Sequence, residues 1–346
     1  MSVRIMIGDA RERLAELPTA SLNCCVTSPP YYGLRDYGIS GQIGLEPTPN
    51  EYIAELVSVF REVRRALRDD GTLWLNIGDS YAGSGKGGNP DSGKQATNKG
   101  SQSIGVLYGK CGDTARQAAV TNVTRKTFAE SGIKIKDLIG IPWMLAFALR
   151  DDGWYLRQDI IWSKPNPMPE SVTDRCTKAH EYLFLLSKSE RYWFDAAAIA
   201  EPAVKAGKFL HSYGTAAKDR QDVSEVNDRR TRIGLANWNQ AQPDTRNKRS
   251  VWDVATQPFS EAHFATFPPA LIEPCILAGC PKDGTVLDCF SGAGTTALVA
   301  DRLERHAIGI EINPEYAKMS CRRIDEDHGA LFGPAVQIVP IRKAAE

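Results

Sequence analysis

The chain has 346 residues, 42% of them hydrophobic, and its 42 basic side chains balance 42 acidic ones. This composition is ordinary for a globular protein with a sizeable core. No stretch approaches the roughly 20 apolar residues of a membrane span, and the first residues lack the layout of a signal peptide, so we expect no membrane association.

The eight cysteines are scattered along the chain and form no Cys-x-x-Cys pair. Cys24 and Cys25 are adjacent within an apolar run, where thiols are usually buried. Cys275 and Cys280 have no histidine beside them that would complete a zinc site. The cysteines therefore predict a reducing, cytoplasmic setting, without disulfides and without a metal.

The N-terminal part of the chain alternates apolar strands with helices. The pattern predicts strands at 3–7, 22–26 and 72–77, and helices at 10–17 and 52–67. Apolar residues in the second helix recur at 53, 56, 57, 60, 63 and 67, which is a near-3.6 period. Residues 68–71, Arg-Asp-Asp-Gly, predict a turn before the third strand.

The alternation continues after a polar interruption. Residues 138–149 predict a helix that contains Pro142, residues 154–162 a strand, and residues 181–194 a β-hairpin that turns at Ser-Lys-Ser-Glu. Strands alternating with helices indicate the α/β class, with a mostly parallel sheet.

A proline pair follows the strand at 22–26. Residues 27–32 read Thr-Ser-Pro-Pro-Tyr-Tyr, so Ser28, Pro29, Pro30 and Tyr31 stand where an apolar strand ends. The prolines have no N–H and fixed φ angles, so their carbonyls are rigid acceptors next to a hydroxyl and an aromatic face. Such a group suits a planar exocyclic NH2, whose ring stacks on the tyrosine. The plain alternative is a Pro-Pro loop after a strand.

A glycine-rich turn lies near the other end of the chain. Residues 285–300 predict a short strand, a tight turn through Phe290, Gly292 and Gly294, and a helix that opens at Thr295-Thr296. Glycines in such a turn allow a ligand to approach the backbone at a helix N-terminus. The next apolar strand, 307–310, ends in Glu311, which is placed to accept hydrogen bonds from ribose hydroxyls. These features favour a nucleoside-containing cofactor.

Together these motifs resemble the amino-directed DNA methyltransferases, which use S-adenosylmethionine. Ser28-Pro29-Pro30-Tyr31 resembles the catalytic motif and residues 288–294 the cofactor loop, and their order along nearly the whole chain is that of the beta class. The family commonly has Pro where this chain has Cys289. The resemblance implies a Rossmann-like methyltransferase fold of circularly permuted motif order, with a mostly parallel twisted sheet and an antiparallel edge hairpin. The cofactor-binding residues that it implies are Asp9, Phe267, Asp288, Phe290, Ser291, Gly292, Gly294, Thr295, Thr296 and Glu311.

The resemblance also implies a mechanism. Hydrogen bonds from the target amine to Ser28 and the Pro29 carbonyl would aim the nitrogen lone pair outward, and Tyr31 would hold the flipped ring. Ser rather than Asp at position 28 is associated in this family more with cytosine N4 than with adenine N6, so we expect N4-methylcytosine, with N6-methyladenine as the alternative.

Charge is unevenly distributed along the chain. Residues 82–136 hold nine Lys or Arg against three Asp or Glu, and residues 205–250 hold ten against five. The first segment is also rich in Gly and Ser and predicts a flexible loop; the second predicts the target-recognition region. Phosphate binding is one reading of both and solvated loops the other. The implied DNA contacts are Lys164, Arg175, Arg229, Arg230, Arg232, Arg246, Lys248 and Arg249.

These segments divide the predicted chain into five parts. The division is a catalytic half at 1–81, the basic insertion at 82–136, a core continuation at 137–204, the recognition region at 205–250 and a cofactor-binding half at 251–346. Trp162 or Tyr32 could line a flipped-base pocket or simply pack, and His180 could be a base that this chemistry does not require.

Other classes explain less of the sequence. A nicotinamide dehydrogenase would account for the glycine turn and Glu311 but not for Ser28-Pro29-Pro30-Tyr31. A glutamine-modifying protein methyltransferase has Asn first and the opposite motif order. A catalytically inactive DNA-binding relative is the remaining alternative. The resemblance implies double-stranded DNA as substrate and a bacterial or phage source, and it is compatible with a cognate restriction endonuclease and with a homodimer.

Overall fold

The computed structural model describes residues 1–33, 39, 41–82, 132–203, 244–257, 266–328 and 336–340. Its residues fall into two compact units, one formed by 1–194 with 250–346 and the other by 195–249. Most of the two predicted basic segments lies outside the described residues, so the loop at 82–136 and the recognition region at 205–250 stay predictions. In the part that is described, no helix has both the length and the apolar character needed to cross a bilayer.

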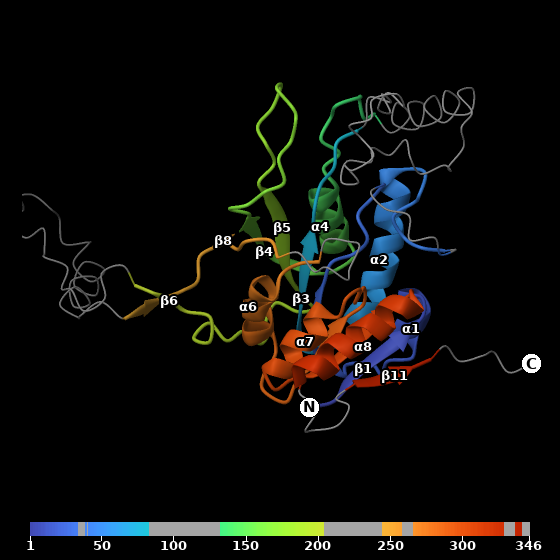
Figure 1. Ribbon diagram of the computed structural model, residues 1–346, viewed down its shortest axis with the longest axis vertical. Coiled ribbons are helices and arrows are strands. Elements are labelled where there is room, and N and C mark those ends of the chain that lie inside the picture. Colours follow the sequence, from blue (N-terminus) through green and yellow to red (C-terminus); the bar gives the residue numbers. More distant parts are fainter. Residues whose placement is uncertain are drawn as a thin grey trace, which may run out of the picture. The chain divides into compact units, whose positions relative to one another are not determined.

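The larger unit is built on a nine-stranded sheet in the order β11-β1-β10-β9-β2-β3-β5-β4-β8 (Figure 1). All pairs are parallel except β3 with β5 and β5 with β4. The strands are β1 (Val3–Ile7), β2 (Leu22–Thr27), β3 (Leu67–Ile77), β4 (Tyr155–Ser163), β5 (His180–Ser187), β8 (Val251–Asp253), β9 (Thr285–Asp288), β10 (His306–Glu311) and β11 (Val336–Val339). The predicted α/β class with a mostly parallel sheet is confirmed.

The two ends of the chain meet in this sheet. β9 and β10, from the C-terminal part, lie between β1 and β2, from the N-terminal part. The register places Cys25 of β2 beside Leu287 of β9, and Val3 of β1 beside Ala307 of β10. Segments from opposite ends of the sequence therefore form the centre of one sheet.

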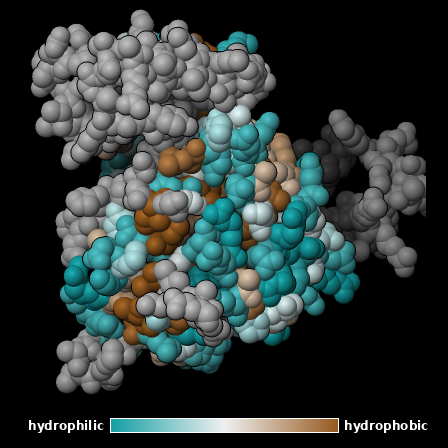
Figure 2. Space-filling view, turned by 90° about the vertical axis from the view of Figure 1, so that its right-hand side faces the viewer, coloured by the Kyte–Doolittle hydropathy of each residue, from teal (hydrophilic) through white to brown (hydrophobic). Residues whose placement is uncertain are grey.

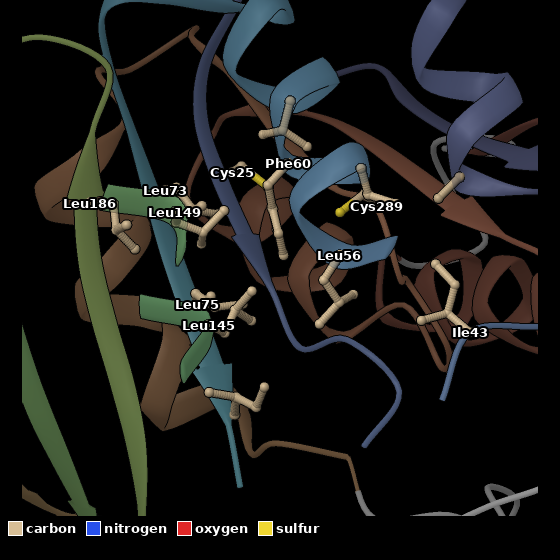
Figure 3. Packing of buried hydrophobic residues seen from close by; sticks show 14 of the residues in the cluster. Cys25, Ile43, Leu56, Phe60, Leu73, Leu75, Leu145, Leu149, Leu186 and Cys289 are labelled. Atoms are coloured by element: carbon tan, nitrogen blue, oxygen red, sulfur yellow. The ribbon is translucent and has the colours of Figure 1, made fainter. Parts of the chain in front are cut away.

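Helices cover both faces of the sheet. They are α1 (Ala10–Ala15), α2 (Pro49–Ala66), α4 (Ile141–Asp151), α6 (Pro269–Gly279), α7 (Thr295–Arg302) and α8 (Pro314–His328). Cys25, Leu73 and Leu75 pack in one apolar cluster with residues of α2 and α4 (Figure 3). Successive strand residues face opposite sides, and accordingly Cys24 and Trp74 lie against Gly279 of α6. Figure 2 shows one face of the molecule, where hydrophobic surface is limited to patches among hydrophilic residues.

Three sequence expectations need correction. The predicted hairpin at 181–194 is wrong: β5 ends at Ser187, and its antiparallel partners are β3 and β4. The turn predicted at 68–71 does not separate the helix from the strand. β3 already begins at Leu67 and includes these residues, and its pairing with β2 shifts register there. The helix predicted from 138 starts at Ile141, which puts Pro142 in its first turn, where a missing N–H costs nothing.

The smaller unit is described only at its two ends. β6 (Glu201–Pro202) pairs antiparallel with β7 (Thr245–Arg246). The Glu201 carboxylate lies 3.1 Å from Arg249, 3.4 Å from Arg246 and 3.8 Å from Lys248.

Candidate active site

The two sequence motifs emerge from neighbouring strands at the same edge of the sheet. β2 ends at Thr27, immediately before Ser28, and β9 ends at Asp288, immediately before the glycine turn. These strands are parallel neighbours, and the carboxyl ends of parallel strands form the usual ligand edge of an α/β sheet. The hydroxyl of Thr27 donates to Asp288 Oδ1 at 2.6 Å, which joins the two motifs directly.

Asp288 is buried and its carboxylate is occupied by the protein itself. Besides Thr27, it accepts a hydrogen bond from the Thr296 hydroxyl at 2.7 Å and one from the Phe290 N–H at 3.1 Å. Burial raises the pKa of this carboxyl, and these three bonds oppose the rise. Asp288 and Thr296, both predicted to touch the cofactor, thus have their side chains turned inward, where they fix the shape of the turn.

The two glycines of the turn have different surroundings. Gly294 has a φ of +72°, and a Cβ there would come within 2.6 Å of the Cβ of Ser320 on α8, so both backbone and packing require glycine. Gly292 has a φ of +50°, and a Cβ there would meet nothing within 4 Å. Open space at Gly292 leaves room for a ligand to approach the backbone.

A second buried carboxylate closes the turn. Glu311 is 8% exposed and accepts the Gly292 N–H at 2.7 Å and the Asn313 N–H at 2.8 Å. Burial raises its pKa to about 7. A carboxylate has about four acceptor positions, so acceptor capacity remains for ribose hydroxyls. The buried hydroxyl of Ser291 has no hydrogen-bond partner among the residues that the structure describes. The turn therefore fits the nucleoside part of a cofactor.

Two further predicted cofactor residues, Asp9 and Phe267, lie just before α1 and α6. Asp9 caps α1, and its carboxylate accepts from the backbone N–H of Arg11 and from its guanidinium. Burial raises the pKa of Asp9, but Arg11 outweighs burial and the net shift is downward. Gly8 N–H donates to the Glu311 carbonyl at 2.9 Å, which brings this segment beside the turn. Phe267 is half-buried, just before α6.

The prolines of the catalytic motif are held from α2. The fully buried Tyr52 donates its hydroxyl to the Pro30 carbonyl at 2.7 Å. Its ring lies 5.4 Å from that of Tyr32, which is 4% exposed and donates to the Pro47 carbonyl. Tyr32 therefore packs in the core, and the pocket role suggested for it is not supported.

Tyr31 is held at its ring and at its hydroxyl. A Cβ at Gly78 would lie 2.6 Å from Cε2 of the Tyr31 ring, so the ring packs directly on that glycine. The hydroxyl donates to Glu181 Oε2 at 2.8 Å, and the Asn76 Oδ1 lies at 3.4 Å. Burial, and after it the charge of Glu181, raises the Tyr31 pKa well above its ordinary value, while a hydrogen bond from Ser28 opposes the rise.

Sequence reasoning missed Tyr52, Asn76, Gly78 and Glu181. For Asn76 and Glu181 the available signal was a polar residue inside or at the start of an apolar strand, Leu-Trp-Leu-Asn-Ile and Glu-Tyr-Leu-Phe-Leu-Leu. A buried polar side chain needs a partner, and here the partners surround the catalytic motif.

The segment between β4 and β5 carries two predicted DNA contacts. The Lys164 ammonium lies 2.5 Å from Glu181 Oε1 and 4.2 Å from the centre of the Trp162 ring. Arg175 pairs with Glu170 at 2.5 Å and lies over the Tyr81 ring. Contact of either with DNA stays a prediction.

The remaining predicted residues have fewer described neighbours. Trp162 is buried and donates to the Val254 carbonyl, and the ring of His180 stands edge-on to that of Tyr182. Arg246, Lys248 and Arg249 surround Glu201, and Arg229, Arg230 and Arg232 lie outside the described residues. Within the described ranges, no three His, Cys, Asp or Glu side chains gather as metal ligands would.

Sequence comparison relates nearly the whole chain to enzymes of one kind. A family model described as DNA methylase matches residues 22–322. The chain is 44% identical to the Type II methyltransferase M.SmaI of Serratia marcescens, over 93% of this chain and 91% of that protein. It is 30% identical to M.SfiI of Streptomyces fimbriatus, over 90% of this chain and 88% of that one.

Solved structures share the fold at low sequence identity. The PvuII DNA methyltransferase, which is cytosine-N4-specific, superposes with a TM-score of 0.57 at 18% identity, over 98% of this chain and 95% of that one. A DNA modification methylase of Thermus thermophilus, solved with S-adenosyl-L-methionine, gives 0.54 at 21% identity, over 97% and 99%. The fold is accordingly Rossmann-like, as the motifs implied.

Proposed function

Because this chain belongs to the amino-directed DNA methyltransferases, which use S-adenosylmethionine, we propose that it methylates the exocyclic N4 of cytosine at specific sites in duplex DNA. The base would flip out of the helix, because its amino group cannot reach the site from within the stack. The hydrogen bond between Thr27 and Asp288 carries the proposal, since it holds the amine-binding motif beside the cofactor turn.

The cofactor would be held by the turn after β9. Glu311 would accept the ribose hydroxyls, and the backbone around Ser291 and Gly292 would approach the ligand closely. Phe290 and Phe267 would contact the adenine and methionine parts, and Asp9 would contact the adenine after exchanging part of its bonding to Arg11. When bound, S-adenosylmethionine supplies a methyl group that its sulfonium has already activated.

The catalytic motif would prepare the nitrogen. The lone pair of a nucleobase amine is delocalised into the ring, so the nitrogen is a poor nucleophile. The Ser28 hydroxyl and the Pro29 carbonyl would accept its two N–H groups and favour a tetrahedral nitrogen with its lone pair aimed at the methyl group. Tyr52 fixes the neighbouring Pro30 carbonyl, so the loop is rigid before the base arrives. Alignment of this kind supplies much of the acceleration.

Ser28 supports cytosine as the target. Serine at the first position of the motif is associated in the family more with cytosine N4, and aspartate with adenine N6. The PvuII enzyme, which has the same fold, is cytosine-N4-specific. Both bases present a similar amino edge, so the assignment depends on an experiment.

Product analysis tests the proposal. The purified chain is incubated with unmethylated genomic DNA and labelled S-adenosylmethionine, and the DNA is digested to nucleosides for mass spectrometry. N4-methylcytosine is the expected product. N6-methyladenine would overturn the base assignment, and unmodified DNA from a protein that binds the cofactor would favour the inactive DNA-binding relative.

DNA would be bound through the basic segments outside the core. We propose that residues 205–250 recognise the target sequence and that residues 82–136 bind the backbone, because both carry a clear excess of positive charge. The relatives M.SmaI and M.SfiI are Type II methyltransferases. We therefore propose that the chain is a bacterial or phage-encoded cytoplasmic enzyme with a cognate restriction endonuclease. We also propose a homodimer, which sedimentation tests.

A further inference from the structure

We propose that Glu181, anchored by Lys164 and Asn76, is a positioning residue for methyl transfer that fixes Tyr31 through its hydroxyl. The inference rests on the proposed use of Tyr31 as the stacking surface for the flipped base, and it holds for either target base. It also gives Lys164 a role inside the protein, where the sequence suggested a phosphate contact.

Glu181 is largely buried, and both of its carboxylate oxygens accept hydrogen bonds. Its side chain is 17% exposed, and its two oxygens serve different partners. Oε2 accepts the Tyr31 hydroxyl at 2.8 Å and lies 3.4 Å from the amide nitrogen of Asn76. Oε1 accepts the Lys164 ammonium at 2.5 Å. One carboxylate therefore joins the catalytic loop after β2 to β3, β4 and β5.

Asn76 turns its amide oxygen, rather than its nitrogen, toward the Tyr31 hydroxyl. It is 2% exposed, and its amide nitrogen donates to the Tyr182 carbonyl at 3.1 Å. That bond identifies the other amide atom as the oxygen, which faces the Tyr31 hydroxyl. The hydroxyl is thus met by two acceptors, from neighbouring strands, and can donate to only one at a time.

Fixing the hydroxyl fixes the ring. Tyrosine has two side-chain torsions, and the contact of its ring with Gly78 prevents the ring from moving toward that residue. The bond to Glu181 restrains the far end of the same ring. A flipped base that stacks on Tyr31 would then meet a plane set before binding, and misplacement of reacting groups by about 1 Å can cost on the order of a hundredfold in rate.

The ammonium of Lys164 is committed to this site. Its side chain is 16% exposed, and it is held between the Glu181 carboxylate and the face of the Trp162 ring. Removing one partner of a buried ion pair leaves the other charge uncompensated. Loss of Lys164 should therefore disturb Glu181 and, through it, Tyr31, whereas loss of a phosphate contact would weaken DNA binding and lower its salt dependence.

A double-mutant cycle tests the proposal on the full-length protein. Glu181→Ala, Tyr31→Phe and the double variant are compared for total methyl transfer from labelled S-adenosylmethionine to genomic DNA, which counts products on either base. We expect Glu181→Ala to lower kcat about tenfold or more, and the double variant to be no slower than the slower single one. Glu181→Gln, which keeps an acceptor for the tyrosine but removes the charge that pairs with Lys164, should recover part of the rate.

Asp152→Asn is the matched control. Asp152 is 15% exposed and pairs with the largely exposed Arg61 on α2, so its loss removes an ion pair outside the motif and should leave kcat within about twofold. Fully additive effects of Glu181→Ala and Tyr31→Phe would overturn the proposal, as would no recovery in a folded Glu181→Gln variant that still binds the cofactor.

A second measurement separates the two roles of Lys164. We expect Lys164→Met to lower kcat while the dependence of DNA affinity on salt keeps its slope. A slope reduced by about 0.9, the value for one phosphate contact, together with an unchanged kcat, would overturn the internal role. A product other than N4-methylcytosine would change only the base assignment and leave both tests valid.

Discussion

At the scale of single residues, the site depends on buried carboxylates whose charge the protein controls. Asp288 accepts three hydrogen bonds from neighbouring residues of the protein, whereas Glu311 accepts backbone N–H groups and keeps acceptor capacity for a ligand. The first fixes the turn and the second is placed to bind.

Glu311 should make cofactor binding depend on pH. Its pKa is raised from 4.5 to about 7 by burial, and ribose hydroxyls donate better to its ionised form. We expect affinity for S-adenosylmethionine, measured by calorimetry, to rise as pH rises through about 7 and to level off above it. Glu311→Gln should bind more weakly at pH 8 and show a flatter profile; a wild-type affinity that does not change between pH 5.5 and 8 would contradict this assignment.

The same shift has the opposite effect on stability. Because the folded pKa exceeds the unfolded one, the stabilising contribution is complete below pH 4.5 and is lost as pH rises through about 7. It can reach about 3 kcal/mol. Urea unfolding of the cofactor-free protein, compared with Glu311→Gln, should show this loss as a wild-type decline that the variant lacks.

The bond between Thr27 and Asp288 should matter for both stability and binding. Thr27→Val keeps the volume but leaves a buried carboxylate short of a donor, and should lower the free energy of unfolding by about 1–3 kcal/mol. It should also weaken cofactor binding, because the turn loses an anchor. Thr72→Val, another fully buried threonine, which accepts from the Trp74 indole, is the control. Equal loss of cofactor affinity in both variants would refute the specific role.

At the scale of elements, β3 and β5 set the position of Tyr31. Gly78 follows β3 and Glu181 lies in β5, and these strands pair antiparallel. A methyl group at Gly78 would overlap the tyrosine ring. We therefore expect Gly78→Ala to lower kcat about tenfold with cofactor affinity unchanged; a variant with normal kcat would show that the ring can shift without harm.

The sequence predicted which segments are strands better than it predicted how they pair. The apolar runs at 22–26 and 307–310 are strands because buried parallel strands carry continuous apolar residues. The expected hairpin at 181–194 failed because Ser187–Glu190 carry turn residues whether or not a strand follows. Periodicity does not identify partners, so neither the pairing of β5 with β3 nor the contact of Glu181 with Tyr31 could be predicted.

At the scale of the whole molecule, chain order and spatial order differ. The catalytic motif and the cofactor turn are some 260 residues apart, yet β2 and β9 are adjacent in the sheet. That adjacency could be inferred from motif order by resemblance, but not from the residues between. The polar partners that hold each motif became visible only with the structure.

Charge distribution gives a prediction at this scale. The chain is neutral overall, whereas residues 205–250 hold ten basic against five acidic side chains. Replacing Arg229, Arg230 and Arg232 with Gln should lower the slope of log affinity against log salt by about 0.9 for each phosphate that they contact. Cofactor affinity should not change. An unchanged slope would remove these arginines from the DNA-binding surface.

Methylation by this protein depends, as proposed, on Ser28 and its prolines holding the target amine beside the cofactor turn. Single-turnover methyl transfer to duplex DNA by Ser28→Ala, measured beside the wild type with cofactor and DNA affinities determined separately, tests this most directly. We predict a rate lower by about a hundredfold, with cofactor affinity unchanged. A rate equal to that of the wild type would contradict the proposed role of Ser28.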